Sequence, residues 1–350
     1  MERDFGGGDD IRFEIAGRAG IVTLTRPKAL NAVNHRMVLA LHRALDAWAA
    51  DAEVALVVIR AEGRAFSAGG DILDIYEAGR AGNPPVGFFA DEYRLNAAIA
   101  RFPKPYVALV DGIVMGGGVG VSFHGSHRVM TENAVFAMPE VGIGFFPDVG
   151  GSRLLAELPR SFGMYLGLTG QRIRRGDALW AGLATHAVDA GNLPALLAAL
   201  CESGDPAAPL RDFCVDEPRG IDEAALHAIA HCFSRDRLED VVASLRLLAD
   251  DGDDFARATL DTLAARSPTS LNVAFRQIGA GAMLSMDECM RMEFRILNRM
   301  LAGHDFYEGI RAAIIDKGSQ PAWRPATLEA VDAADIEAYF APLPGGDLEL

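Results

Sequence analysis

Residues 106–122 read YVALVDGIVMGGGVGVS, an apolar run that leads into three adjacent glycines at 116–118. The run at 106–110 has the length and composition of a buried strand. Glycines leave the backbone N–H groups unobstructed, and a helix beginning at Gly118 would direct its positive end toward an anion or a developing oxyanion. A tight turn with close backbone packing would explain the same glycines. The spacing is not GxGxxG and no GK[ST] follows, so neither a dinucleotide fingerprint nor a P-loop is predicted.

A second small-residue turn, FSAGGDI at 66–72, follows another apolar run, VALVVI at 54–59. It offers an unobstructed backbone amide, for instance at Ala68, so two such turns at the ends of buried strands would supply a pair of oxyanion donors. The surrounding AFSAG resembles a nucleophile elbow around Ser67. An elbow needs its strand to run straight into the serine, and here three residues at 62–64 intervene, so a Ser67 nucleophile is disfavoured.

Two carboxylates stand eight residues apart in PEVGIGFFPDVGG (139–151), a segment otherwise of glycine, proline and apolar residues. Apolar surroundings would raise the pKa of Glu140 or Asp148 and make it a usable proton donor or acceptor near neutral pH. Two carboxyls in different environments can also divide the acid and base roles. A surface loop with solvated side chains is the alternative. The two phenylalanines at 145 and 146 favour a cleft.

Strand-like and helix-like segments alternate through the first half of the chain, which predicts an α/β core over residues 1–192. Residues 11–15 and 21–24 predict an opening hairpin, and Asn34 is placed to cap the first helix. After residue 192 the strand-like runs nearly vanish. Residues 193–350 therefore predict a helical C-terminal region, with helices at 195–203, 222–232, 235–250, 253–266, 270–283 and 286–302.

The 350 residues are half hydrophobic and 23% charged, which is the composition of a globular protein with one large domain or two ordinary ones. No uninterrupted apolar stretch reaches the 18 or so residues of a membrane span. A formal net charge of −15 argues against nonspecific nucleic-acid or anionic-membrane binding. The opening MERDFGGGDD has neither the apolar core of a secretory signal nor the composition of a transit peptide, so a cytoplasmic location is expected.

The cysteines and histidines predict neither a disulfide framework nor a metal site. The four cysteines, at 201, 214, 232 and 289, form no CxxC pair, which favours a reducing compartment. His227 and His231 are four residues apart, but alanine replaces the HExxH glutamate and no third ligand is apparent. His124 and His127 lack a nearby cysteine or aspartate.

The two glycine turns and the segment 139–151 resemble those of the enoyl-CoA hydratase/isomerase (crotonase) superfamily. Within it, the chain is most similar to the 3-hydroxyisobutyryl-CoA hydrolases. The similarity covers roughly residues 10–325. It is carried by RPKALNA (26–32), SAGGDI (67–72), MGGGVGVS (115–122), FAMPEVGIGFFPDVGG (136–151), LTG (168–170), AGLATH (181–186), SPTSL (267–271), GHDFYEGIRAAIIDK (303–317) and PAWRP (321–325).

The resemblance implies a spiral of ββα turns with a helical C-terminal region and an acyl-CoA substrate, with no cofactor apart from the CoA of that substrate. Ala68 and Gly117 match the family's oxyanion hole, and Glu140 and Asp148 match its catalytic carboxylates. Glu92 matches a third acid of the substrate site. The positions expected to enclose the CoA nucleotide are Lys28, Ala29, Leu30, Gly70, Asp71 and Ile72. Members often assemble as trimers, so a homo-oligomer is among the expected states.

One departure from the superfamily pattern favours hydrolysis over hydration. Hydratases carry a catalytic glutamate three residues after the middle glycine of the triple, and that position here is Gly120. The sequence keeps Glu140 and adds Asp148 where hydratases usually carry glycine. The expected reaction is hydrolysis of 3-hydroxyisobutyryl-CoA in valine breakdown, with 3-hydroxypropionyl-CoA as a further candidate substrate. A hydratase/isomerase of another short-chain acyl-CoA and a noncatalytic CoA-binding protein remain as alternatives.

Overall fold

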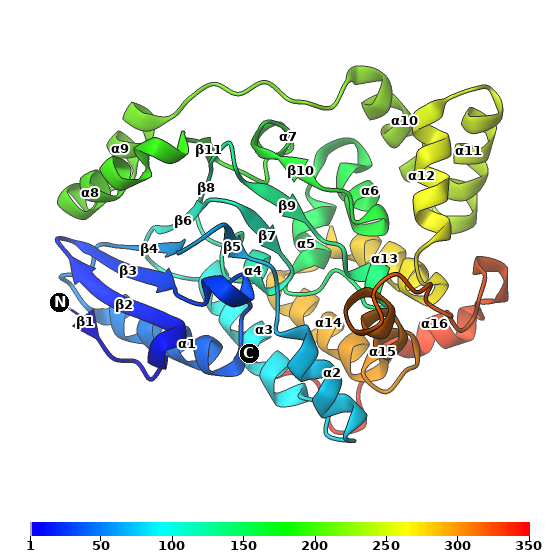
Figure 1. Ribbon diagram of the computed structural model, residues 1–350, viewed down its shortest axis with the longest axis horizontal. Helices are drawn as coiled ribbons and strands as arrows, with labels where there is room; N and C mark the ends of the chain where they lie inside the picture. Colours follow the sequence, from blue (N-terminus) through cyan, green and yellow to red (C-terminus); the bar gives the residue numbers. More distant parts are fainter. Residues whose placement is uncertain (1) are drawn as a thin grey trace. The chain divides into compact units, whose positions relative to one another are not determined.

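The computed structural model describes residues 2–350, which divide into two compact units interleaved along the chain (Figure 1). The first unit comprises residues 2–71, Gly87–Phe136 and Ile173–Gly220, and the second comprises Ile72–Val86, Ala137–Arg172 and Ile221–Leu350. The boundary predicted at residue 192 falls inside the first unit, because the helices that follow it pack on the sheet of that unit.

A seven-stranded sheet forms the centre of the first unit. Its second and third strands are the predicted antiparallel hairpin, and from the third strand onward neighbouring strands run parallel. Parallel pairing fits the near-continuous apolar runs at 54–59 and 106–110, since strands of such sheets are covered on both faces. In spatial order the strands are β1 (Glu2–Arg3), β2 (Ile11–Ala16), β3 (Ala19–Leu24), β4 (Leu56–Ala61), β6 (Tyr106–Val110), β8 (His127–Met130) and β11 (His186–Ala187).

Helices cover both faces of this sheet. Ala19 and Ile21 of β3 belong to a buried cluster with Leu196 and Leu200 of α8 (Leu193–Ser203), and α9 (Ala207–Phe213) adds to the same cluster. On the other face lies α1 (His35–Ala50), whose Asn34 cap accepts a hydrogen bond from the Met37 N–H. A Cβ on Gly20 of β3 would come within 2.7 Å of the Trp48 ring of α1, so glycine allows the helix this close.

The second sheet of this unit is smaller and carries the glycine turns. Its strands, in spatial order, are β10 (Ile173–Arg174), β9 (Val135–Ala137), β7 (Ile113–Met115) and β5 (Ala65–Ser67). Strands β5 and β7 pair in parallel. The remaining helices of the unit are α3 (Val86–Ala100), α4 (Gly117–Gly120) and α7 (Arg175–Trp180).

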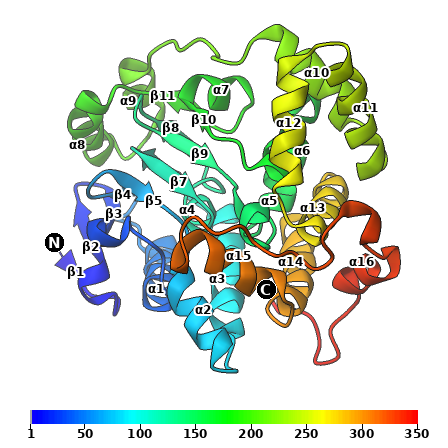
Figure 2. The same cartoon turned by 45° about the vertical axis from the view of Figure 1, so that its right-hand side comes forward.

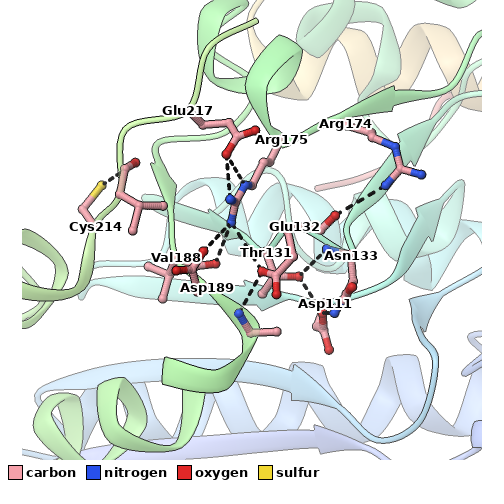
Figure 3. A network of polar contacts seen from close by, with 12 residues as sticks. Asp111, Thr131, Glu132, Asn133, Arg174, Arg175, Val188, Asp189, Cys214 and Glu217 are labelled. Carbon is pink, nitrogen blue, oxygen red and sulfur yellow. Dashed lines mark hydrogen bonds and ion pairs between the residues drawn. The ribbon is translucent and has the colours of Figure 1, made fainter. Parts of the chain in front are cut away.

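A network of charged side chains around Arg175 links segments of the first unit that are distant in sequence (Figure 3). Its guanidinium bonds Glu217 through Nε at 2.8 Å and Asp189 through Nη1 at 3.1 Å, and it pairs with Glu132 at 3.4 Å. Arg175 thus contacts three carboxylates from different loops. Asp189 precedes α8 and Glu217 follows α9, so Arg175 joins both ends of this helical pair to Glu132, which lies between β8 and β9.

The second unit is almost entirely helical. Helix α13 packs against α5, α6 and α14 at the centre, and α2 lies beside α15 (Figure 2). A Cβ on Gly281 of α13 would come within 2.1 Å of the Ser152 carbonyl of α5, so this contact requires glycine. The helices are α2 (Ile72–Arg80), α5 (Gly151–Ala156), α6 (Phe162–Thr169), α10 (Glu223–Phe233), α11 (Leu238–Asp250), α12 (Asp254–Ala264), α13 (Pro268–Gly281), α14 (Met286–Met300), α15 (Asp305–Ile310) and α16 (Ala333–Phe340).

The predicted fold class is confirmed: the chain is α/β, with parallel strands in its first half and helices after residue 192. Among residues 2–350, no helix combines the length and apolar character needed to cross a bilayer. All four cysteines are free thiols.

Candidate active site

The two glycine turns of the first unit lie side by side because they follow paired parallel strands. Ala65 of β5 pairs with Ile113 of β7, so the carboxyl ends of both strands reach the same edge of the sheet. A Cβ on Gly118 would come within 2.6 Å of the Ser67 carbonyl oxygen, and one on Gly117 would lie 3.4 Å from the Gly70 nitrogen. The triple glycine is therefore required for close backbone approach.

The Gly70 and Gly117 amides are among the donors left available in these turns. Among the described residues, neither N–H makes a hydrogen bond with a backbone carbonyl outside its own helix or strand. Gly117 is the first residue of α4, where the N–H has no partner within the helix. The Ala68 N–H, expected from the sequence to be the second donor, is 3.0 Å from the Leu30 carbonyl oxygen and donates to it.

The loop that holds Ala68 is fixed by Asn31, which is completely buried. Leu30 and Asn31 adopt left-handed conformations, with φ of 51° and 55°. The Asn31 side chain donates 2.8 Å hydrogen bonds to the carbonyls of Glu62 and Ala65. This geometry brings the Leu30 carbonyl onto the Ala68 amide, an interaction that short-range sequence patterns do not reveal.

Glu92 of α3 lies against the same turn. Its side chain is 2% exposed, and its Oε1 is 2.7 Å from the position of a Cβ on Gly117. The structure thus brings together three of the residues expected at the site, Gly70, Gly117 and Glu92.

The residues expected to bind CoA lie in both units. Lys28 and Ala29 belong to an exposed 3₁₀ helix, Pro27–Ala29, which Leu30 follows. Asp71 closes the Gly70 turn and accepts a hydrogen bond from Arg26 Nη2 at 3.0 Å. Ile72 begins α2 of the second unit.

The two predicted catalytic carboxyls are both buried in the second unit. Glu140 begins a 3₁₀ helix, Glu140–Ile143, and is 7% exposed, while Asp148 is 5% exposed. The rings of Phe145 and Phe146 lie between them in sequence, with centroids 4.6 Å apart. The segment is therefore part of the interior of its unit, and the solvated surface loop considered as an alternative is not what forms.

Glu140 lies in an environment that opposes ionisation. Burial raises the pKa of its carboxyl well above the ordinary value, and the charge of Asp148 raises it further. Its Oε2 is buried without a hydrogen-bond partner in the described chain. Buried carboxyl oxygens are normally satisfied, so this atom is available to a ligand or water.

Glu293 of α14 is a buried carboxyl that the sequence analysis did not single out. It is fully buried and accepts hydrogen bonds from Gly150 and Ser152, close to Asp148 in the chain. The helical spacing of the sequence could have indicated its burial. Met290, Glu293 and Leu297 share one helix face, so a glutamate occupies a core position.

The predicted lack of a metal site is not contradicted by the histidine positions. His227 is largely exposed and pairs with Glu223 at 3.3 Å. Within residues 2–350, no group of three or more histidine, cysteine, aspartate or glutamate side chains is arranged to hold a metal ion.

Comparison with known proteins identifies the family of the chain. The sequence profile of the enoyl-CoA hydratase/isomerase family matches residues 19–340. A mitochondrial 3-hydroxyisobutyryl-CoA hydrolase of Xenopus tropicalis is 44% identical over 348 residues, covering 96% of this chain and 89% of its own.

Two solved structures share the whole fold. A carnitinyl-CoA dehydratase from Mycobacterium thermoresistibile superposes with a TM-score of 0.91 at 40% identity, covering 97% of this chain and 98% of its own. An enoyl-CoA hydratase from Rhodobacter sphaeroides 2.4.1 gives 0.90 at 39% identity, covering 97% of this chain and 100% of its own. The names of these similar proteins describe two types of reaction, hydrolysis and hydration.

The raised pKa of Glu140 predicts a stability cost that depends on pH. Between the lower pKa of the unfolded state and the raised pKa of the folded state, the folded chain binds more protons, so stability falls as pH rises. Glu140→Gln removes this pH-dependent loss of stability, because an amide does not ionise. The variant should gain stability over the wild type as pH rises above about 4.5, by up to about 1.4 kcal/mol per pH unit within that window.

Urea unfolding of both proteins at pH 5 and pH 8 measures this effect. Glu53→Gln, at an exposed position, is the matched control for the substitution itself. A Glu140→Gln stability difference that is the same at both pH values would contradict the buried, hard-to-ionise carboxyl.

Proposed function

The chain belongs to the enoyl-CoA hydratase/isomerase family, and from this premise we propose that it hydrolyses 3-hydroxyisobutyryl-CoA to the free hydroxy acid and CoA. The observation that carries the proposal is the set of carboxyls. Glu140 and Asp148 are both buried, whereas Gly120, at the end of α4, offers no carboxyl where hydratases of the family carry a catalytic glutamate. The similar hydrolase of Xenopus tropicalis supports the same substrate.

The proposal assigns the thioester oxygen to the amides of Gly70 and Gly117. Gly70 takes the role first expected of Ala68, because the Ala68 N–H already donates to Leu30. A single oxyanion donor typically contributes about 3 kcal/mol of transition-state stabilisation. Backbone donors need no reorientation during the reaction, since the neighbouring strands fix them.

Glu140 is the proposed reacting carboxylate. In one form of the reaction, it attacks the thioester carbonyl and expels CoA thiolate, which leaves a mixed anhydride that water hydrolyses. In the other, it removes a proton from the water that attacks the carbonyl. Asp148 assists proton transfer. In both forms, the burial that raises the pKa of Glu140 makes it a stronger base near neutral pH.

Glu92 is the proposed partner of the substrate hydroxyl. A buried group that must bond a hydroxyl rejects acyl chains that lack one, so Glu92 would favour 3-hydroxyacyl groups. The turns at Lys28–Leu30 and Gly70–Ile72 are proposed to enclose the CoA nucleotide, and the reaction is proposed to need no cofactor. 3-Hydroxypropionyl-CoA is a further candidate substrate.

The wider biological setting is also a proposal. Release of 3-hydroxyisobutyrate places the enzyme in valine breakdown. A cytoplasmic location stays a prediction, since the similar vertebrate hydrolases are named mitochondrial. Assembly as a homo-oligomer also stays a prediction.

A hydratase is the second candidate because two solved structures with TM-scores of 0.91 and 0.90 carry the names of a dehydratase and a hydratase. The hydrolase should release CoA thiol from (S)-3-hydroxyisobutyryl-CoA and should not hydrate crotonyl-CoA. Glu140→Gln should abolish thiol release, because an amide neither attacks a carbonyl nor accepts a proton from water. Thiol-reagent absorbance and the loss of enoyl absorbance measure the two reactions. Hydration without thiol release would overturn the proposal.

The oxyanion assignment predicts a large effect of one methyl group. Gly117→Ala places a Cβ 2.7 Å from Glu92 Oε1 and 3.4 Å from the Gly70 nitrogen, in the space assigned to the thioester oxygen. We expect kcat to fall on the order of 100-fold, the effect of losing one oxyanion donor. Gly191→Ala, whose Cβ would meet no atom within 4 Å, is the matched control. Equal activity of the two variants would exclude Gly117 from the role.

Isotope labelling separates the two forms of the reaction. In a single turnover in oxygen-18 water, the mixed anhydride places label in the Glu140 carboxyl when water attacks the enzyme's acyl carbon. Mass spectrometry of the peptide that contains Glu140 detects that label. Label in the Glu140 carboxyl would exclude the general-base form, because that form places the oxygen of water only in the released acid.

A further inference from the structure

We propose that Glu293 is a positioning residue for Asp148, holding the turn that follows this aspartate. The inference rests on the proposed hydrolase function, because that function gives Asp148 its role in the reaction. Glu293 itself is not proposed to touch the substrate. It acts through the backbone of residues 150–152.

The carboxyl of Glu293 receives three hydrogen bonds from one short segment. Oε2 accepts from the Gly150 N–H at 2.8 Å, and Oε1 accepts from the Ser152 N–H at 3.0 Å and the Ser152 hydroxyl at 2.5 Å. Glu293 is 0% exposed, so no water competes for these donors. Three donors converging on two oxygens fix both the side chain and the turn.

The turn needs such an anchor because its backbone is strained. Val149, directly after Asp148, has a φ of 51°, a conformation that a β-branched residue rarely adopts. Gly150 follows with a φ of 85°. Strained residues of this kind persist only where their surroundings hold them, and they concentrate at functional sites.

A second buried side chain holds the other side of Asp148. Gln277 of α13 is 0% exposed and donates from Nε2 to the Pro147 carbonyl at 2.6 Å. The backbone is therefore anchored immediately before and shortly after Asp148, from two different helices. Such anchoring fixes the direction of a side chain that the catalytic role requires to be accurate.

Glu293 lies close enough to Asp148 for the two carboxyls to interact electrostatically. Burial raises the pKa of Glu293 to about 8, the hydrogen bonds from Ser152 and Gly150 oppose this rise, and the charge of Asp148 adds to it. Asp148 also raises the pKa of Glu140. Asp148 thus interacts with both carboxyls, one assigned to the reaction and one holding the turn.

Glu293→Gln tests the inference, because the amide keeps the size of the side chain but turns an N–H₂ group toward backbone donors. We expect kcat for thiol release to fall on the order of 10- to 100-fold, as for a small misplacement of a catalytic group, with KM within about threefold. In an Asp148→Asn background the same change should lower kcat less than about twofold further, because it acts through Asp148. Glu53→Gln, the same change at an exposed position, is the matched control.

Hydrogen exchange of the Gly150 and Ser152 amides supplies a readout independent of activity. Exchange should be at least about tenfold faster in Glu293→Gln than in the wild type, because the two amides lose their acceptor. Unchanged exchange would overturn the inference whatever reaction the enzyme performs. Unchanged kcat, a loss confined to KM, or a full further loss in the Asp148→Asn background would overturn it as well.

Two more measurements cover a variant that fails to fold and a wild type that lacks hydrolase activity. If Glu293→Gln does not fold, Ser152→Ala decides: removing one of the three donors should lower kcat and speed exchange of Gly150, and no change in either would overturn the inference. If the wild type releases no CoA thiol, the hydrolase proposal is wrong. Faster exchange in Glu293→Gln would then still show that Glu293 holds the turn.

Discussion

Burying a carboxyl group is costly unless hydrogen bonds or nearby charges compensate, and the second unit buries four of them. Glu293 is compensated by three hydrogen-bond donors, and Asp305 accepts from the Ser267 hydroxyl, the Arg324 N–H and the His304 ring. Glu140 differs, because its Oε2 has no partner in the described chain and it shares its surroundings with the charge of Asp148. The carboxyls of Glu293 and Asp305 are satisfied, and Oε2 of Glu140 is not.

The first unit contributes backbone donors at the ends of two paired strands. Parallel pairing of β5 and β7 brings two turns together, and glycines at 117 and 118 allow a separation that no side chain would permit. Hydrogen bonds within the turns then decide which amides stay available. Ala68 is used to hold its own loop against Leu30, whereas Gly70 and Gly117 are not used in that way.

The sequence predicted what depends on local pattern and missed what depends on long-range contacts. The hairpin of β2 and β3, the buried strands and the burial of Glu140 and Asp148 follow from periodicity and composition, and the structure contains all of them. The Ala68–Leu30 hydrogen bond depends on two left-handed residues, Leu30 and Asn31, which lie 38 and 37 positions before Ala68, and no local signal indicates that pairing. The link from Glu293 to Ser152 spans 141 residues. The interleaving of the two units, in which residue 192 is no boundary, likewise arises from packing.

Backbone amides and carboxyl side chains differ in how easily mutation changes them. A backbone amide cannot be removed by an ordinary substitution, because every residue except proline supplies one. A carboxyl is gained or lost by changing a single side chain. Two solved structures that share this fold at TM-scores near 0.9 are named a dehydratase and a hydratase, while sequence relatives are named hydrolases, which fits a scaffold whose donors stay fixed while its acids vary. On this argument, positions 120, 140 and 148 decide which reaction follows once the acyl oxygen is held. Glu293 belongs with the scaffold, since it acts on the backbone that carries one of those acids.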